Sequence, residues 1–116
     1  MNIESIFEEI NEERLNQEEK WGQQEHPMLD PVLLKRKGGC TPWRMCEEYE
    51  IPSESRAKNL TDIRAREGQL TYFHILQEEV SEAVCALNDY ESMRKELVQV
   101  AAVTVAMIQT LDRNGR

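Results

Sequence analysis

Five side chains that could bind a divalent cation lie on two neighbouring stretches of the sequence. Glu78, Glu79 and Glu82 belong to HILQEEVSEAVCAL, and Glu96 and Gln99 belong to KELVQVAAVTVAMI. Carboxylates that converge in a partly buried place repel one another, so they either take up protons or hold a cation. Oxygen ligands of this kind suit a hard ion such as Mg²⁺ or Mn²⁺, which also binds substrate phosphates. The alternative is that these glutamates only form a solvated helical face.

Both stretches have the spacing of helices that pair in an antiparallel hairpin. Apolar residues recur every three or four positions, which predicts a helix over residues 71–88 and another over residues 92–111. Thr71 opens the first helix, and Asn88 and Glu91 have the spacing of a capping box at the turn. The acidic residues flank the apolar stripes on a helical wheel, so the hairpin can bring them together.

An amphipathic helix is also predicted near the N-terminus, over residues 3–21. Its apolar stripe includes Phe7 and Ile10 and continues through the polar residues Arg14 and Gln17. A polar residue on such a stripe either reaches solvent past its neighbours or contacts a ligand.

The middle of the chain is predicted to be mostly loop, followed by one helix. All four prolines lie between residues 22 and 52, where no long periodicity survives, although we expect a short helical piece over residues 43–49. Residues 53–67 predict a helix that Ser53 caps and Gly68 ends. No stretch predicts a strand, so the fold class is all-α, in a single domain over residues 1–116 with an irregular, loop-rich insertion over residues 28–52.

Composition excludes several classes of partner. The net charge is −8 and no basic stripe is present, which argues against nucleic acid as a partner. No apolar run approaches the roughly 18 residues of a membrane span, and the acidic N-terminus does not resemble a secretory signal. Three cysteines, an odd number, fit a reducing compartment, so we expect a cytoplasmic protein.

The cysteines and histidines give weaker signals. Cys40 and Cys46, together with His26, could suggest zinc, but their C-x₅-C spacing is longer than the usual two to four intervening residues. Cys85 is most simply a small apolar filler, and His74 has a structural role in our interpretation. No role is assigned to His26.

Several motifs resemble one family of enzymes. The E-x-x-E of Glu79 and Glu82, followed by Glu96 and Gln99, resembles the E-x-x-E and E-x-x-D motifs of MazG-like all-α nucleoside triphosphate pyrophosphohydrolases. The stretches ERLNQEEKWGQQEHP, GQLTYFHILQEEVSEA and ELVQVAAVTVAMI resemble, in the same order, segments of a small phage and bacterial subgroup.

The resemblance implies a fold, an activity and ligands. It implies a helical hairpin and an N-terminal helix in a four-helix bundle completed by a homodimer or homotetramer, and Mg²⁺-dependent cleavage of a nucleoside triphosphate to monophosphate and pyrophosphate. By motif match Glu79, Glu82 and Glu96 would be metal ligands, with Gln99 at the fourth ligand position. Glu78 would bind a further ion or help activate the attacking water. Gln99 departs from the aspartate of the wider family, and a neutral amide binds cations more weakly.

Substrate contacts are expected from basic and aromatic residues. Arg14 or Lys20 would contact phosphate, and Gln17 or Trp21 would contact the base, because guanidinium groups bind phosphate and indoles stack. Lys58 is a further phosphate candidate, although a solvated side chain is the simpler interpretation. Two other functions stay open: a nucleotide- or alarmone-binding module without catalysis, and a helical interaction protein.

Overall fold

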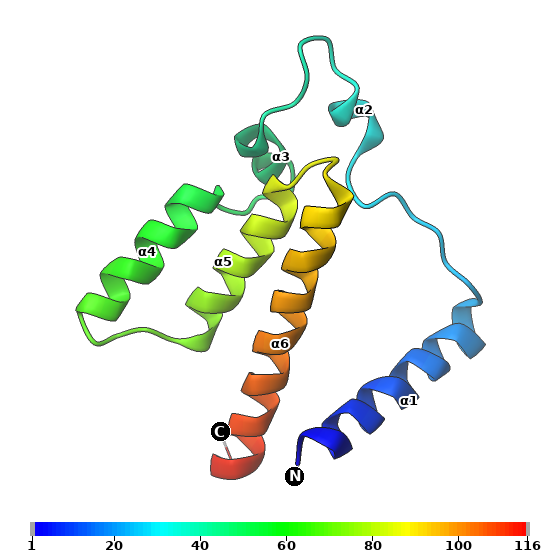
Figure 1. Cartoon of the computed structure of the whole chain (residues 1–116), viewed down its shortest axis with the longest axis vertical. Coiled ribbons are helices and arrows are strands. Elements are labelled where there is room, and N and C mark those ends of the chain that lie inside the picture. The colour runs from blue at the N-terminus through cyan, green and yellow to red at the C-terminus, as the bar shows by residue number, and fades with distance from the viewer. Residues whose placement is uncertain (1, 116) are drawn as a thin grey trace. The chain divides into compact units, whose positions relative to one another are not determined.

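The computed structural model describes residues 2–115 and is all-α, with 72% helix in that part of the chain. Six helices follow one another (Figure 1): α1 Ile3–Trp21, α2 Pro31–Leu34, α3 Pro42–Glu48, α4 Glu54–Arg66, α5 Tyr72–Cys85 and α6 Tyr90–Asn114. None of the described helices is long and apolar enough to cross a membrane. The chain divides into two compact units, one from Leu29 to Val103 and one that joins the segment ending at Met28 to the segment starting at Thr104.

In the unit from Leu29 to Val103, α3 and α4 both pack against α5, and α6 follows α5 as the second arm of a hairpin (Figure 1). Its buried cluster consists of Leu29, Leu33, Met45 and Met93, with Val84 and Leu87 among the apolar residues packed against it. The segment predicted to be an irregular insertion therefore contains two short helices that cover the turn end of the hairpin. The short helix α2 was not predicted, although Asp30 caps it and Pro31 supplies its first residue, a common helix start.

A hydrogen bond from a side chain to the backbone attaches α5 to the preceding segment. The Ser81 hydroxyl, whose residue is 0% exposed, donates to the carbonyl of Pro52 at 3.0 Å. The Thr61 hydroxyl on α4 donates mainly to the carbonyl of Ala57 in its own helix at 2.9 Å, and the carbonyl of His74 on α5 lies 3.3 Å from the same hydroxyl. Hydroxyl groups removed from solvent need such partners, and the hydrogen bond of Ser81 is the direct link between α5 and the segment before it.

Two predicted helix starts are confirmed, and each is formed by a local capping residue. The hydroxyl of Ser53 accepts from the backbone N–H of Arg56 at 3.4 Å, and α4 begins at the next residue. Thr71 caps α5 and forms a capping box in which His74 Nδ1 accepts from the backbone N–H of Thr71 at 3.0 Å. His74 thus has the structural role that the sequence predicts.

The turn between α5 and α6 differs from the prediction. Helix α5 ends at Cys85 rather than near Asn88, and Leu87 has a positive φ of 54°. The prediction of a capping box formed by Asn88 and Glu91 is wrong. Instead, Asp89 Oδ1 accepts from the backbone N–H of Ser92 at 3.1 Å and caps α6. Helix α6 is consequently longer at its start, and it also continues past the predicted end at residue 111.

The other unit consists of α1, the segment after it and the C-terminal part of α6. Helix α1 has the predicted bounds, with Asn2 as its N-cap. The predicted apolar stripe is largely uncovered, since Ile3 and Phe7 are 46% and 54% exposed, and the buried residue of α1 is Ile6, which was not predicted to belong to that stripe. Two helical segments are too few to cover a whole helical face, which explains why only one residue of α1 is buried.

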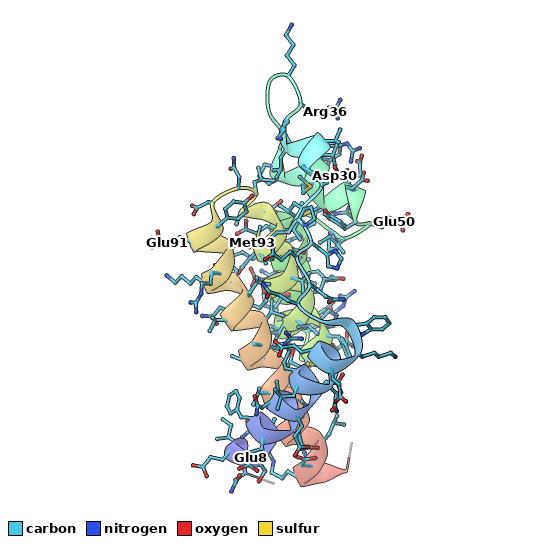
Figure 2. All side chains as sticks on the ribbon, turned by 90° about the vertical axis from the view of Figure 1, so that its right-hand side faces the viewer. Glu8, Asp30, Arg36, Glu50, Glu91 and Met93 are labelled. Carbon is cyan, nitrogen blue, oxygen red and sulfur yellow. The ribbon has the colours of Figure 1, made fainter. Side chains whose placement is uncertain are left out.

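The apolar face predicted for the last helix is also only partly buried. Met93 is 4% exposed, but Leu97 and Leu111 are 40% and 53% exposed. The less exposed positions on the first half of α6 include Glu96 and Val100. The acidic residue Glu96 therefore lies on the inner side of the helix, where the sequence predicts mainly apolar contacts. Figure 2 labels Met93 and Glu91 at the start of α6, where Glu91 extends away from the helix.

Candidate metal centre

Three glutamates from both arms of the hairpin converge. Each of Glu79, Glu82 and Glu96 offers one carboxylate oxygen, and these oxygens lie within 4.8 Å of one another. Glu79 and Glu82 are three positions apart on α5 and so share one face of that helix, while Glu96 lies on α6. Two oxygens on opposite sides of one Mg²⁺ ion lie about 4.2 Å apart. Small side-chain movements would therefore close this set of oxygens around a single ion.

One oxygen of the cluster has no partner within the protein. Glu79 Oε2 is buried and makes no hydrogen bond, and it is the only such side-chain atom in the described part of the chain. A buried polar atom without a partner costs free energy, so most native proteins supply one. A cation bound by the three carboxylates would satisfy this oxygen, and the donor set therefore fits Mg²⁺ or Mn²⁺.

Crowding changes the acidity of the two α5 carboxylates. Burial, above all, raises the pKa of Glu82 to about 7, and the neighbouring carboxylates of Glu96, Glu79 and Glu78 add to the rise. Burial and the charge of Glu96 also raise the pKa of Glu79, although its interaction with Glu82 opposes this. The protein without metal consequently retains protons that a cation would displace.

The other two predicted ligands lie near this cluster in sequence but outside the converging set. Glu78 precedes Glu79 on α5 and contributes its negative charge to both raised pKa values. Gln99 follows Glu96 by three positions on α6 and is exposed. The geometry thus brings together the three predicted glutamate ligands, and Glu78 is not part of this group of three, while Gln99 is exposed on α6.

The predicted substrate contacts on α1 interact mainly with one another. Arg14 Nη1 donates to Gln17 Oε1 at 2.6 Å, and Gln17 Nε2 donates to Glu13 at 3.1 Å. The Lys20 ammonium lies 4.7 Å from the centre of the Trp21 ring. All four predicted residues belong to the unit formed by the terminal segments, in which Arg14 and Gln17 line a cavity of about 410 Å³.

Two residues without an assigned role line cavities. His26 lines the same 410 Å³ cavity as Arg14 and Gln17. Trp43, which is 59% exposed, and Lys58 line a second cavity of about 460 Å³ in the other unit, beside Cys85. Lys58 also pairs with Asp62 at 3.8 Å on the surface of α4, so it is not a solitary cation. No local pattern in the sequence predicts this second cavity, because α3, α4 and the end of α5 form it jointly.

No family model matches this chain, and no curated protein or solved structure is significantly similar to it.

Proposed function

We propose that this protein is a Mg²⁺-dependent nucleoside triphosphate pyrophosphohydrolase of the MazG-like type. The observation that carries the proposal is the convergence of three carboxylate oxygens from α5 and α6. One of the three side chains, Glu79, also has a buried oxygen that makes no hydrogen bond. The motif resemblance supplies the substrate class, a nucleoside triphosphate, and the reaction products, a nucleoside monophosphate and pyrophosphate.

In this proposal Glu79, Glu82 and Glu96 hold the ion, and Mn²⁺ is an acceptable substitute for Mg²⁺. When bound, the ion supplies Lewis-acid stabilisation of the charge on the triphosphate. Glu78, which precedes Glu79 on α5, orients the attacking water and accepts its proton. By the motif resemblance alone, Arg14 and Lys20 are the proposed phosphate contacts, and Gln17 and Trp21 are proposed to contact the base.

Binding geometry is the main contribution of the chain to this reaction. Residues on the two arms of the hairpin place the three oxygens within 4.8 Å of one another, and pre-organised ligands lower the cost of positioning substrate. A homodimer or homotetramer that completes a four-helix bundle is part of the proposal, as the resemblance implies. Exposed apolar residues such as Leu97 and Val98 on α6 are compatible with such an assembly.

A second candidate is a nucleotide- or alarmone-binding module without catalysis. Gln99 favours this candidate, because an amide contributes less charge to a metal site than the aspartate of the wider family and cannot act as a base. Both candidates require metal and nucleotide to bind together, and only the first requires pyrophosphate to be released.

The deciding experiment measures pyrophosphate and monophosphate release from a panel of canonical and modified ribo- and deoxyribonucleoside triphosphates. Reactions contain Mg²⁺ or Mn²⁺, and EDTA serves as the control. We expect metal-dependent release with at least one substrate, and its loss in Glu79→Gln. Binding of nucleotide by calorimetry without any release would favour the binding module. If folded protein neither binds nucleotide nor releases pyrophosphate, both candidate functions are refuted.

A matched control separates loss of a ligand from a general change of charge. Glu91→Gln removes one negative charge at an exposed position near the start of α6, away from the converging oxygens. It should leave metal-dependent release unchanged. An equal loss in both variants would show that net charge, rather than the three-carboxylate site, accounts for the effect.

A further inference from the structure

Two of the three cysteines meet where α3 packs against the end of α5. Cys46 Sγ on α3 lies 3.5 Å from Cys85 Sγ, and both are free thiols. A disulfide bond has a sulfur–sulfur length of about 2.05 Å, so the two atoms need to approach by only about 1.5 Å. The packing of α3 on α5 already holds the two side chains face to face.

The two thiols differ in access. Cys46 is 1% exposed, whereas Cys85 is only partly buried and lines the 460 Å³ cavity together with Trp43 and Lys58. A small molecule that enters this cavity therefore meets Cys85 first and finds Cys46 behind it. Cys40, the third cysteine, does not line this cavity and directs its thiol to the carbonyl of Thr41.

We infer that Cys85 and Cys46 form a thiol pair that a low-molecular-weight disulfide oxidises through the cavity lined by Cys85. The Cys85 thiolate attacks one sulfur of the small disulfide, forms a mixed disulfide and releases one thiol. Cys46 then attacks Cys85 Sγ, which forms the intramolecular disulfide and releases the second thiol. The protein loses two electrons and two protons, which is the mass of two hydrogen atoms, and the small disulfide becomes two thiols.

The order of the two steps follows from the environment of Cys46. Burial, together with the neighbouring Cys85 and Glu54, raises the pKa of Cys46 to about 12, which leaves it almost entirely protonated near neutral pH. The thiolate is the reactive form, so Cys46 is a poor first nucleophile for a disulfide in solution. Its position 3.5 Å from Cys85 instead suits it to the second, intramolecular step.

The test uses full-length protein, oxidised glutathione as the probe, and mass spectrometry after thiol blocking. Wild type should lose the mass of two hydrogen atoms, and digestion should yield one linked pair of peptides containing Cys46 and Cys85. The Cys46→Ser variant should instead retain one glutathione on Cys85, and Cys85→Ser should oxidise at least tenfold more slowly than wild type. Cys40→Ser should behave as wild type does.

The digest of wild type keeps the inference falsifiable even if a substituted chain does not fold. A link through Cys40, a link between two chains, or unmodified thiols after prolonged exposure of folded protein to oxidised glutathione would each overturn it. Retention of glutathione on Cys46 rather than on Cys85 would overturn the proposed order of attack. None of these readouts depends on nucleotide hydrolysis.

Discussion

The carboxylates of Glu82 and Glu96 approach each other within 4.8 Å, although they lie on different arms of the hairpin. Their proximity raises the pKa of Glu82 in addition to the larger effect of burial. Like charges at this distance destabilise a folded protein unless a proton or a cation lies between them.

The first prediction concerns metal binding. Mg²⁺ or Mn²⁺ should raise the Tm of the wild-type protein near pH 8, because an ion that binds only the folded state stabilises it by about 2.7 kcal/mol at 100 times its Kd. The Glu79→Gln variant should lose this response. Differential scanning fluorimetry at increasing metal concentration measures the effect.

Glu91→Gln is the control for that measurement, because Glu91 is exposed on α6. It should retain the full metal response and change the free energy of unfolding by less than about 0.5 kcal/mol. A full response in Glu79→Gln would remove Glu79 from the ligand set.

The second prediction is a pH dependence of stability without metal. The pKa of Glu82 is raised from 4.5 to about 7, so the folded state holds more protons than the unfolded state between these values. The free energy of unfolding should therefore fall as pH rises from about 4.5 to about 7, and this contribution should then level off. Because Glu82 is partly exposed, we expect a loss of about 1–2 kcal/mol rather than the full value of the shift.

Urea denaturation at several pH values in EDTA tests this dependence. Glu82→Gln should be more stable than wild type by about 1–2 kcal/mol at pH 8 and close to wild type at pH 4.5. If Glu82→Gln is destabilised equally at both pH values, repulsion and burial of the Glu82 carboxylate do not lower the stability of the wild-type protein.

The third prediction concerns Gln99. If its side chain occupies the fourth ligand position, Gln99→Asp should strengthen Mg²⁺ binding by about tenfold, or about 1.4 kcal/mol, since a carboxylate binds a hard cation better than an amide. Isothermal calorimetry measures the Kd. Gln109→Asp adds the same charge about 15 Å further along α6 and should change the Kd little. Equal effects of the two substitutions would indicate general attraction of the cation.

The fourth prediction concerns the support of α5. Ser81→Ala removes the only hydrogen bond described for the Ser81 hydroxyl and leaves the Pro52 carbonyl without that donor. It should lower the free energy of unfolding by about 1–3 kcal/mol. Ser55→Ala removes only an exposed contact of 3.3 Å with the Ser53 hydroxyl and should be nearly neutral. Chemical denaturation compares the two, and a neutral Ser81→Ala would show that water replaces the lost contact.

Local signals in the sequence were sufficient to predict where several helices begin. The caps Ser53 and Thr71 act on residues three positions away, so a short stretch contains all the information needed to place α4 and α5. Helical periodicity likewise predicts that Glu79, Glu82 and Glu96 can converge, because two paired helices fix which faces meet.

Other features depend on contacts between distant residues. Asn88 and Asp89 are both good helix caps by residue type, and in the structure Asp89 accepts the capping hydrogen bond from Ser92. Leu29 and Leu33 cover the hairpin from a segment without periodicity, so their burial could not be read locally. The pairing of Cys46 with Cys85 also requires the packing of α3 on α5.

The hydrogen bond from Ser81 to the Pro52 carbonyl restricts the rotation of α5 about its own axis. Successive residues of an α-helix are about 100° apart, so Ser81 and Glu79 point in nearly opposite directions. The attachment of Ser81 to Pro52 therefore determines which way Glu79 faces. Insertion of one alanine between these two positions would keep every ligand in the chain, yet it would turn Glu79 by about 100° away from its present direction and separate it from Glu82 and Glu96.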